Sequence, residues 1–489
     1  MRRNINLKIY NLFNCGELFL DLTQITENGL KNELKDVPII SSLEKTADTL
    51  NRRRKVIFDM SVNDIIGILN EIGVLWSNPD FEPRKALKQI FLQTGQFSEE
   101  MVDLSFTYMV NMYNKEYLEQ ILDYDLMGNR EVLDDFIRLY DKTPINIRAV
   151  PRGIAGHWIS GNTLIIGQIS LLRTILTKNA NIIKVSSKNK IFLPIFLDSF
   201  KYVNYQNDKG ISINGSVLAS CTSVIYFDSS DKECNKELSK CVNIRIARGG
   251  RKAIHAIMNT KKEYGTEDVI YGPKYSMIAI GRECLSYKKI NTLVKNIAID
   301  FSIWDQYACT SPHVIFAEKN GEISVEELAK KISEQMELLE KILPNESVNN
   351  DNAPAIVAAR IENELNGITY CKPNTSWSVL FNEEITELPK PLFSRVVRVV
   401  AIDDISRIYG LIDKYVQTVG VAMEEGKKKR FINECTYRGV ERCVPVGLMH
   451  TMLPGSPWDG FFNCDRMVRW VSYFDSRKGT INEDLIIDF

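Results

Sequence analysis

Histidines are scarce in this sequence, long apolar runs are missing, and the net charge is close to zero. Only four histidines occur in 489 residues, and they show no HExxH or similar spacing, so a metal site has no support. No stretch approaches the ~18 uninterrupted apolar residues of a membrane span. The N-terminus also lacks the apolar segment of a secretion signal. We therefore expect a cytoplasmic protein with no membrane span and no metal.

Charge and cysteine usage exclude further classes of protein. The 61 basic and 62 acidic residues leave a formal net charge of −1, which provides no field to attract a polyanion. Nucleic acid is therefore not an expected partner. The ten cysteines include no CxxC pair, and in a chain without a signal we expect reduced thiols rather than a disulfide framework.

Three common catalytic motifs are absent as well. The sequence contains no GxGxxG, no GxxxxGK[ST] and no GxSxG. A P-loop kinase and an α/β-hydrolase therefore lose their main sequence support.

The pattern of apolar residues changes near residue 145. Before that point, helical spacing predicts a largely helical region over 60–141. Beyond it, short apolar strands alternate with helices, which is typical of a parallel sheet flanked by helices. The strands are predicted at 145–150, 182–185, 224–227 and 242–246, with a glycine-rich loop at 153–161 and a helix at 164–177.

A second α/β unit is predicted to begin near Gly272-Pro273. Its strands are expected at 276–280 and 314–316, and its helices at 290–299 and 324–342. Cys309 falls in the loop between the first of these helices and the strand at 314–316. A thiol in such a loop can act as a nucleophile where backbone amides lower its pKa. The alternative is a small buried hydrophobic side chain, which is the commoner role of a cysteine.

Two polar segments are further candidates. Ser160-Gly161-Asn162-Thr163 precedes a helix, so it is either an N-cap or the source of an amide that stabilises an oxyanion. Residues 184–190 follow a buried strand and carry three lysines and two serines. Because ligands of open α/β sheets bind beyond the carboxyl ends of strands, this segment could hold a ribose and its phosphate; the alternative is a solvated loop.

Taken together, these segments resemble the LuxC-type acyl-CoA reductases of the aldehyde dehydrogenase superfamily, which supply the long-chain aldehyde of bacterial luminescence. The resemblance covers roughly residues 55–475. It rests on the blocks Ser160-Gly161-Asn162, 179–187, Arg248-Gly249-Gly250, 271–276, 305–312, 417–420, Asp459-Gly460 and 468–470.

The resemblance implies a role for each matching residue. Cys309 would accept the acyl group, and Asn162 would stabilise the oxyanion together with the backbone N–H of Cys309. Lys184 would contact the adenosine ribose, with Ser186, Ser187 and Lys188 near its 2′ position. Ser229 and Ser230 would lie at the cofactor pyrophosphate, although Asp228-Ser229-Ser230-Asp231 departs from the usual Gly-Ser-Thr-like turn. Gly249 of the Gly-Gly turn would also belong to the cofactor site.

A second departure concerns the fate of the acyl-enzyme. Hydrolytic aldehyde dehydrogenases carry a glutamate two residues before the Gly-Gly pair, where this sequence has Ala247. Alanine cannot activate water, so discharge by hydride or by a thiol is expected. The segment 184–190 has no acidic residue, which favours NADPH over NADH because a carboxylate would repel a 2′-phosphate.

These observations predict an aldehyde dehydrogenase-like α/β fold in four regions: an N-terminal extension and helical region (1–144), a Rossmann-type NADPH-binding domain (145–272), a catalytic domain (273–446) and a C-terminal segment (447–489). The expected activity is NADPH-dependent reduction of a long-chain acyl-CoA to the aldehyde. The alternatives are a CoA-acylating aldehyde dehydrogenase working oxidatively, and a cysteine acyltransferase or binding subunit without redox activity. The resemblance further implies an acyl-protein donor, acyltransferase and acyl-protein synthetase partners, and a homo-oligomer.

Overall fold

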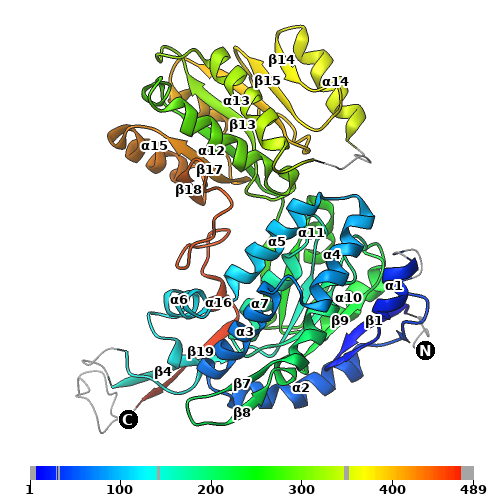
Figure 1. The fold of residues 1–489 in the computed structure, drawn as a ribbon. Helices are drawn as coiled ribbons and strands as arrows, with labels where there is room; N and C mark the ends of the chain where they lie inside the picture. Colours follow the sequence, from blue (N-terminus) through cyan, green and yellow to red (C-terminus); the bar gives the residue numbers. More distant parts are fainter. Residues whose placement is uncertain (1–6, 29, 31–32, 140–143, 346–351, 475–489) are drawn as a thin grey trace. The chain divides into compact units, whose positions relative to one another are not determined.

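The computed structural model describes residues 7–28, 30, 33–139, 144–345 and 352–474 (Figure 1). The chain forms two compact units. The first comprises residues 1–87, 106–272 and 454–489, and the second comprises residues 88–105 and 273–453. The helical region and the C-terminal segment thus contribute mainly to the unit that also holds residues 145–272. Residues 475–489 of the C-terminal segment lie outside the described residues.

The first unit is built on a largely parallel sheet. Its strand order is β11-β10-β5-β6-β9-β1-β2, with β3 paired to β1. The five strands from β5 to β11 are parallel, and β1 runs antiparallel to β9. When the five parallel strands are numbered by their order in the chain, they lie across the sheet as 5-4-1-2-3, which is the Rossmann order. The chain connections therefore run in opposite directions on the two sides of the boundary between β5 and β10. The strands are β1 (Ile9–Asn14), β2 (Glu17–Leu18), β3 (Ile39–Ile40), β5 (Ile154–Trp158), β6 (Ala180–Lys184), β9 (Thr222–Tyr226), β10 (Ile244–Arg248) and β11 (Glu267–Tyr271).

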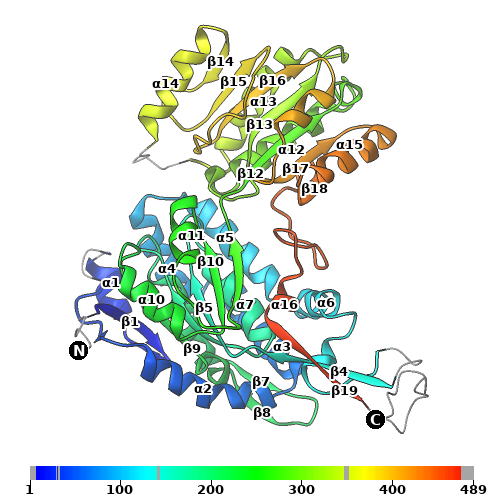
Figure 2. The same cartoon turned by 180° about the vertical axis from the view of Figure 1, so that it is seen from behind.

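Helices lie on both faces of this sheet: Figure 1 shows α3 and α7 on one face, and Figure 2 shows α10 and α11 on the other. Ten of the eleven residues of α7 are buried, including the polar Gln168, Ser170, Arg173 and Thr174. The helices are α1 (Leu22–Asn28), α2 (Glu44–Asp59), α3 (Val62–Ser77), α6 (Lys115–Asp125), α7 (Ile166–Leu176), α8 (Phe192–Asp198), α9 (Ser216–Ala219), α10 (Lys232–Lys240), α11 (Arg251–Met258) and α16 (Asn463–Arg466), with 3-10 turns η2 (Arg130–Leu133) and η3 (Ser199–Tyr202). Helices α4 (Glu82–Thr94) and α5 (Glu99–Met112) carry residues of both units.

The sequence-based prediction was wrong about where this sheet begins. The segment predicted as a glycine-rich loop contains β5, a fully buried strand between β10 and β6. Gly156 is required there because a Cβ at this position would lie 2.8 Å from Cγ1 of Val242. The predicted first strand is β4 (Ile145–Pro151), which pairs outside the sheet with β19 (Val468–Phe474). A small hairpin joins β7 (Asn204–Gln206) to β8 (Ser212–Asn214).

The second unit repeats the same topology. Its sheet has the order β14-β15-β16-β13-β12-β17-β18, in which only β14 is antiparallel to its neighbour. Strands β12, β13, β16, β17 and β18 again follow the Rossmann order. The strands are β12 (Tyr275–Ile280), β13 (Pro312–Glu318), β14 (Gly367–Cys371), β15 (Ser378–Asn382), β16 (Val396–Ile402), β17 (Val416–Ala422) and β18 (Arg442–Pro445).

Two apolar layers enclose this second sheet. On one face, α12 and α13 pack through residues such as Ile297, Phe301 and Leu328. On the other face, η6 and α15 pack through Ile408 and Phe431. The helices are α12 (Ile290–Ser302), α13 (Val325–Glu340), α14 (Ala353–Glu364) and α15 (Glu425–Tyr437), with η4 (Arg282–Cys284), η5 (Ile303–Gln306) and η6 (Ile405–Leu411). Because both faces are covered, polar chemistry in this unit is restricted to the ends of the strands.

Candidate active site

The candidate cofactor residues of the first unit gather at one edge of its sheet. Lys184, the last residue of β6, stands in register with Trp158 of β5 and Ile225 of β9. The carboxyl ends of these strands therefore meet at the same edge. The predicted residues follow those ends: Asn162 after β5, Ser186, Ser187 and Lys188 after β6, Ser229 and Ser230 after β9, and Gly249 after β10.

Lys184 and Ser229, which come from two different loops, are in direct contact. The Lys184 side chain is 4% exposed, and its Nζ donates a hydrogen bond of 2.5 Å to Oγ of Ser229. Burial lowers the pKa of Lys184 to about 8, although the nearby Asp228 carboxylate partly opposes the shift. Ser230 behaves differently, because its hydroxyl and its backbone N–H both donate to Oδ1 of Asp228. The structure thus places Ser229, rather than Ser230, beside the lysine.

The turn after β5 packs against the loop after β6. A Cβ on Gly161 would lie 2.4 Å from Oγ of Ser186 and 2.9 Å from Cβ of Lys188, so glycine is required for this close approach. Asn162 is half-buried, and its Oδ1 accepts a 2.6 Å hydrogen bond from Oγ of Ser160. Helix α7 begins only at Ile166, and its N-cap residue Ile165 makes no side-chain cap bond. The alternative that residues 160–163 cap this helix is therefore wrong.

An acidic residue that the local sequence does not reveal lies beside the lysine-containing loop. Glu33, from the N-terminal segment, forms an ion pair with Lys190. Lys190 also lies 5.0 Å from the ring centroid of Tyr226. Lys188 remains exposed. The three lysines of 184–190 thus have different environments: one is buried, one is exposed and one is paired with a carboxylate.

The end of β10 contains no carboxylate. Ala247 is fully buried in register with Trp158 and Ile270. The Arg248 guanidinium stacks on Tyr271, 3.5 Å from the ring centroid. No atom comes within 4 Å of where a Cβ on Gly250 would lie, which leaves room for a ligand close to the backbone.

Cys309 lies in the second unit, in the short turn between η5 and β13, where its side chain is partly exposed. Its carbonyl oxygen accepts a 2.8 Å hydrogen bond from Oγ of Ser276, the second residue of β12. Cys309 therefore stands at the amino edge of its sheet. Other thiols are less suited to act as nucleophiles, since burial raises the pKa of Cys221 and Cys443 to about 11.

A cation and a neutral histidine surround the Cys309 turn. Burial lowers the pKa of the Arg442 guanidinium, whereas the nearby Cys309 sulfur and Asp300 carboxylate raise it. His450 is buried, which lowers its pKa to about 4. Its Nε2 lies 2.8 Å from the carbonyl oxygen of Asp300 and therefore carries the hydrogen, so Nδ1 accepts from the Thr310 hydroxyl at 2.9 Å.

Sequence reasoning missed Arg442 and His450. They come from β18 and the turn after it, more than a hundred residues from Cys309. Asp300 orders this turn by accepting from the backbone N–H groups of Gly447 and Met449. No local spacing in the sequence could have revealed these contacts.

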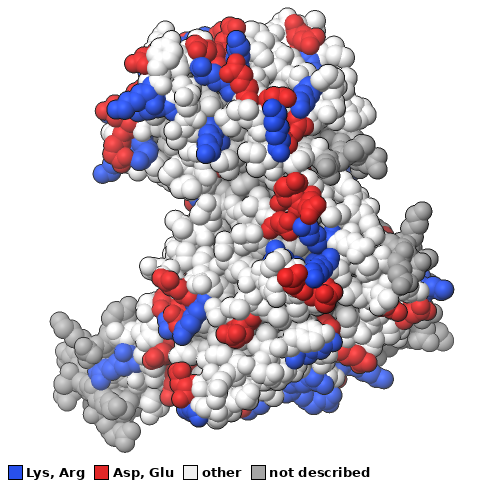
Figure 3. All heavy atoms as spheres, in the orientation of Figure 1, with Lys and Arg blue, Asp and Glu red and all other residues white. Residues whose placement is uncertain are grey.

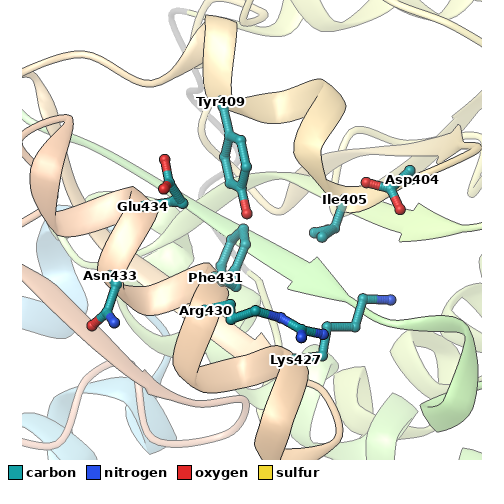
Figure 4. A pocket seen from close by; sticks show the side chains of 8 residues that line it. All are labelled: Asp404, Ile405, Tyr409, Lys427, Arg430, Phe431, Asn433 and Glu434. Atoms are coloured by element: carbon teal, nitrogen blue, oxygen red, sulfur yellow. The ribbon is translucent and has the colours of Figure 1, made fainter.

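A pocket in the second unit lies at the carboxyl end of the sheet, opposite the end that holds Cys309. It has a volume of about 630 Å³ and opens between η6 and α15, where Tyr409 and Phe431 lie among charged side chains (Figure 4). Lys427 in its lining pairs with Glu318, the last residue of β13. Cys309 precedes the first residue of β13, and seven residues of strand span about 20 Å. The Cys309 thiol therefore does not line this pocket.

The family model for acyl-CoA reductase (LuxC) matches residues 57–470. The chain belongs to this family. It is similar to the long-chain acyl-protein thioester reductases of Vibrio harveyi (27% identity, covering 85% of this chain and 83% of the relative) and Aliivibrio fischeri (27%, covering 88% and 85%). The expected class of enzyme, an acyl reductase, is thereby confirmed.

Solved structures confirm the aldehyde dehydrogenase-like fold. Aldehyde dehydrogenase 21 from Physcomitrella patens superimposes with a TM-score of 0.67 at 11% identity, covering 96% of this chain and 99% of that one. Lactaldehyde dehydrogenase from Escherichia coli gives a TM-score of 0.61 at 11% identity, with coverages of 88% and 90%.

The ranges that the structure describes also bear on membrane and metal association in this member of the acyl-CoA reductase family. Within them, no helix has the length and hydrophobicity that crossing a bilayer requires. Nor does any group of three His, Cys, Asp or Glu side chains in the described part of the chain have a geometry that could hold a metal ion. On the face drawn in Figure 3, basic and acidic side chains are interspersed.

The Lys184 environment predicts a pH-dependent stability. An unfolded lysine keeps its proton up to about pH 10.5, whereas the folded Lys184 loses it above about 8. The unfolded chain therefore binds more protons within this window, so the free energy of unfolding rises with pH there. We expect the stability of wild type relative to Lys184→Met to increase between pH 7.5 and 9.5, as measured by urea unfolding. The exposed Lys209→Met serves as the control; a constant difference between wild type and Lys184→Met would contradict the assignment.

Proposed function

We propose that this member of the acyl-CoA reductase family uses NADPH to reduce a long-chain fatty acyl thioester to the aldehyde through an acyl group on Cys309. The observation that carries the proposal is the setting of Cys309: a partly exposed thiol within the residues that the family model matches, with the Arg442 cation close enough to interact with its sulfur. A nearby cation favours the thiolate, which is the nucleophilic form.

The acyl transfer needs no external energy source, because one thioester replaces another. The Cys309 sulfur attacks the carbonyl carbon of the donor, a new carbon–sulfur bond forms, and the bond to the carrier sulfur breaks. The carrier leaves as a thiolate and takes up a proton. Ala247, in place of a carboxylate, leaves this position with no base to activate water, which favours retention of the acyl group until it is reduced.

The carboxyl edge of the first sheet fits a nicotinamide cofactor. A buried lysine bonded to a serine, an open approach to Gly250 and the reversal between β5 and β10 support this part of the proposal. In the proposal Lys184, Ser186, Ser187 and Lys188 hold the adenosine ribose, and Ser229, Ser230 and Gly249 lie near the pyrophosphate. When bound, NADPH supplies the hydride that reduces the acyl carbonyl.

Residues 145–272 thus form the cofactor-binding part and 273–446 the catalytic part of the proposed enzyme. The Asn162 amide and the Cys309 backbone N–H stabilise the oxyanion that develops on reduction. Collapse of this oxyanion breaks the bond to the Cys309 sulfur and releases the aldehyde.

The names of the relatives bear on the acyl donor. Because the Vibrio harveyi and Aliivibrio fischeri proteins are named acyl-protein thioester reductases, we propose a carrier protein as a donor alongside acyl-CoA. An acyltransferase and an acyl-protein synthetase are the partners that would load such a carrier, and the enzyme is proposed to act as a homo-oligomer.

The proposed nucleophile predicts a specific covalent adduct. Incubation with labelled long-chain acyl-CoA without reductant should acylate Cys309, as located by peptide mass spectrometry. Cys309→Ala should abolish the adduct and leave the melting temperature nearly unchanged, because the side chain is partly exposed. Cys371→Ala removes an exposed thiol and is the matched control, which should acylate as wild type. Label retained in Cys309→Ala would refute the proposal.

The oxyanion role predicts a different defect for Asn162→Ala. This variant should still acylate Cys309, but reduction of the acyl-enzyme should slow by roughly 10²–10³, because one donor to the developing charge is lost. Single-turnover kinetics separate the two steps. The conservative variant Asn162→Asp, which keeps the shape but places an acceptor there, should be at least as slow. Reduction of the acyl-enzyme at the wild-type rate in Asn162→Ala would argue against this role.

Cofactor choice is tested at the exposed Lys188. If its ammonium group faces the 2′-phosphate, Lys188→Ala should raise KM for NADPH about tenfold while KM for NADH changes little, since a charge-assisted contact is lost only for NADPH. Lys209→Ala in the turn between β7 and β8 removes another exposed lysine of this unit as the control. Equal changes for the two cofactors would exclude Lys188 from the discrimination.

A further inference from the structure

Two short segments of the second unit adopt a backbone conformation that L-residues rarely hold. Trp304, Asp305 and Gln306 have φ values of 50°, 49° and 65°. Residues 393–395, which are Phe, Ser and Arg, have φ values of 57°, 51° and 59°. Single non-glycine residues visit this left-handed region, but three in succession are unusual and persist only where surrounding contacts enforce them.

The two left-handed segments hold each other in place. Nε of Arg395 donates to Oδ1 of Asp305 at 2.7 Å, and these two side chains are at most 1% exposed. The backbone N–H of Ser394 donates to the carbonyl of Asp305 at 2.9 Å. Beside this pair, the rings of Tyr307 and Phe393 are stacked at 5.1 Å. A side-chain ion pair, a backbone bond and a ring contact therefore join the same two stretches of chain.

We call the joined segments 304–306 and 393–395 the clamp. Gln306 connects the clamp directly to the Cys309 turn. Its side chain is fully buried, and its Nε2 donates to the carbonyls of Pro312 at 2.8 Å and Val396 at 2.9 Å. Its Oε1 accepts from the N–H of Val396 at 2.7 Å. The bond to Pro312 joins the two ends of the segment 306–312, with Cys309 at its centre. The Gln306 amide thus closes the turn that contains Cys309 and attaches it to Val396, the first residue of β16.

We propose that Gln306 and the Asp305–Arg395 ion pair are positioning residues for Cys309: by clamping segments 304–306 and 393–395 together, they hold the thiol in the orientation from which it attacks a thioester. This inference rests on the proposed role of Cys309 as the acyl acceptor. The hydrogen bond from Ser276 fixes the Cys309 carbonyl from β12, but it does not constrain the ends of the turn. The function of the clamp is to supply that constraint.

The test compares two reactions of the same sulfur. Acyl transfer from acyl-CoA requires alignment of the thiol with a bound thioester, whereas alkylation by iodoacetamide does not. Gln306→Glu preserves size and the acceptor for Val396 but removes the two N–H donors. We expect acylation of Cys309 to slow about tenfold or more, because small misplacements are costly in oriented reactions. Alkylation of Cys309 should change less than about threefold, since it depends on thiolate content and access.

A matched control and a rescue separate positioning from general damage. Gln206→Glu, at an exposed position of β7, should leave both rates at wild-type values. Asp305→Asn leaves the buried Arg395 without a counter-charge and should impair acylation. The double variant Asp305→Asn/Arg395→Gln replaces the ion pair with a neutral hydrogen bond and should recover acylation relative to the single variant. If Gln306→Glu does not fold, this pair of variants carries the test.

The outcomes distinguish the inference from the function on which it rests. Absence of any acyl adduct on Cys309 in wild type overturns the proposed function and the clamp together. A normal wild-type adduct with unchanged acylation in Gln306→Glu overturns the positioning role alone. Parallel loss of acylation and alkylation, or acylation that falls only in proportion to the folded fraction, also overturns it by showing a purely structural role. Failure of the neutral double variant to improve on Asp305→Asn overturns the part assigned to the ion pair.

Discussion

A parallel sheet covered by helices on both faces can present polar chemistry only where its strands end. Both units of this protein are built under that constraint, with their central strands buried and ordered alike. The first unit uses the carboxyl edge of its sheet, where Lys184 and Ser229 meet. The second places Cys309 at the amino edge, before β13. The same topology thus provides the proposed cofactor-binding edge in one unit and the position of the proposed nucleophile in the other.

The polar groups at these edges are costly to bury, and the structure offsets that cost with specific partners. Asp300 accepts two backbone N–H groups, and Asp305 is paired with Arg395. The offset is partial: burial still raises the pKa of Asp300 to about 7 and lowers that of Lys184 to about 8, where the Ser229 hydroxyl carries no compensating charge. Such buried polar contacts fix geometry more than they add stability, since desolvation cancels much of their attraction. They are therefore suited to holding a reactive group in one orientation.

Three positions singled out by their sequence have distinct surroundings in the fold. Ala247 lies within the buried strand β10, so the position two residues before the Gly-Gly pair carries no carboxylate that could activate water. In the turn after β9, Ser230 is bonded to Asp228 while Ser229 contacts Lys184. The two serines, for which the sequence predicts the same role, therefore have different surroundings. Glu33, far from the lysine-containing loop in the sequence, pairs with Lys190 and reduces the excess of positive charge there.

The amino-acid sequence by itself determined the family, the α/β class and the order of most strands and helices, because these depend on local apolar periodicity and on motifs of contiguous residues. It misjudged β5, because the glycines of this segment are typical of a loop, whereas Gly156 is needed for close packing against Val242. Only the tertiary structure decided that Arg442, His450 and Arg395 surround the Cys309 turn, since they come from β18, the turn after it and the residue before β16. Contacts between residues so far apart leave no local pattern: they are set by which strands become neighbours in the sheet.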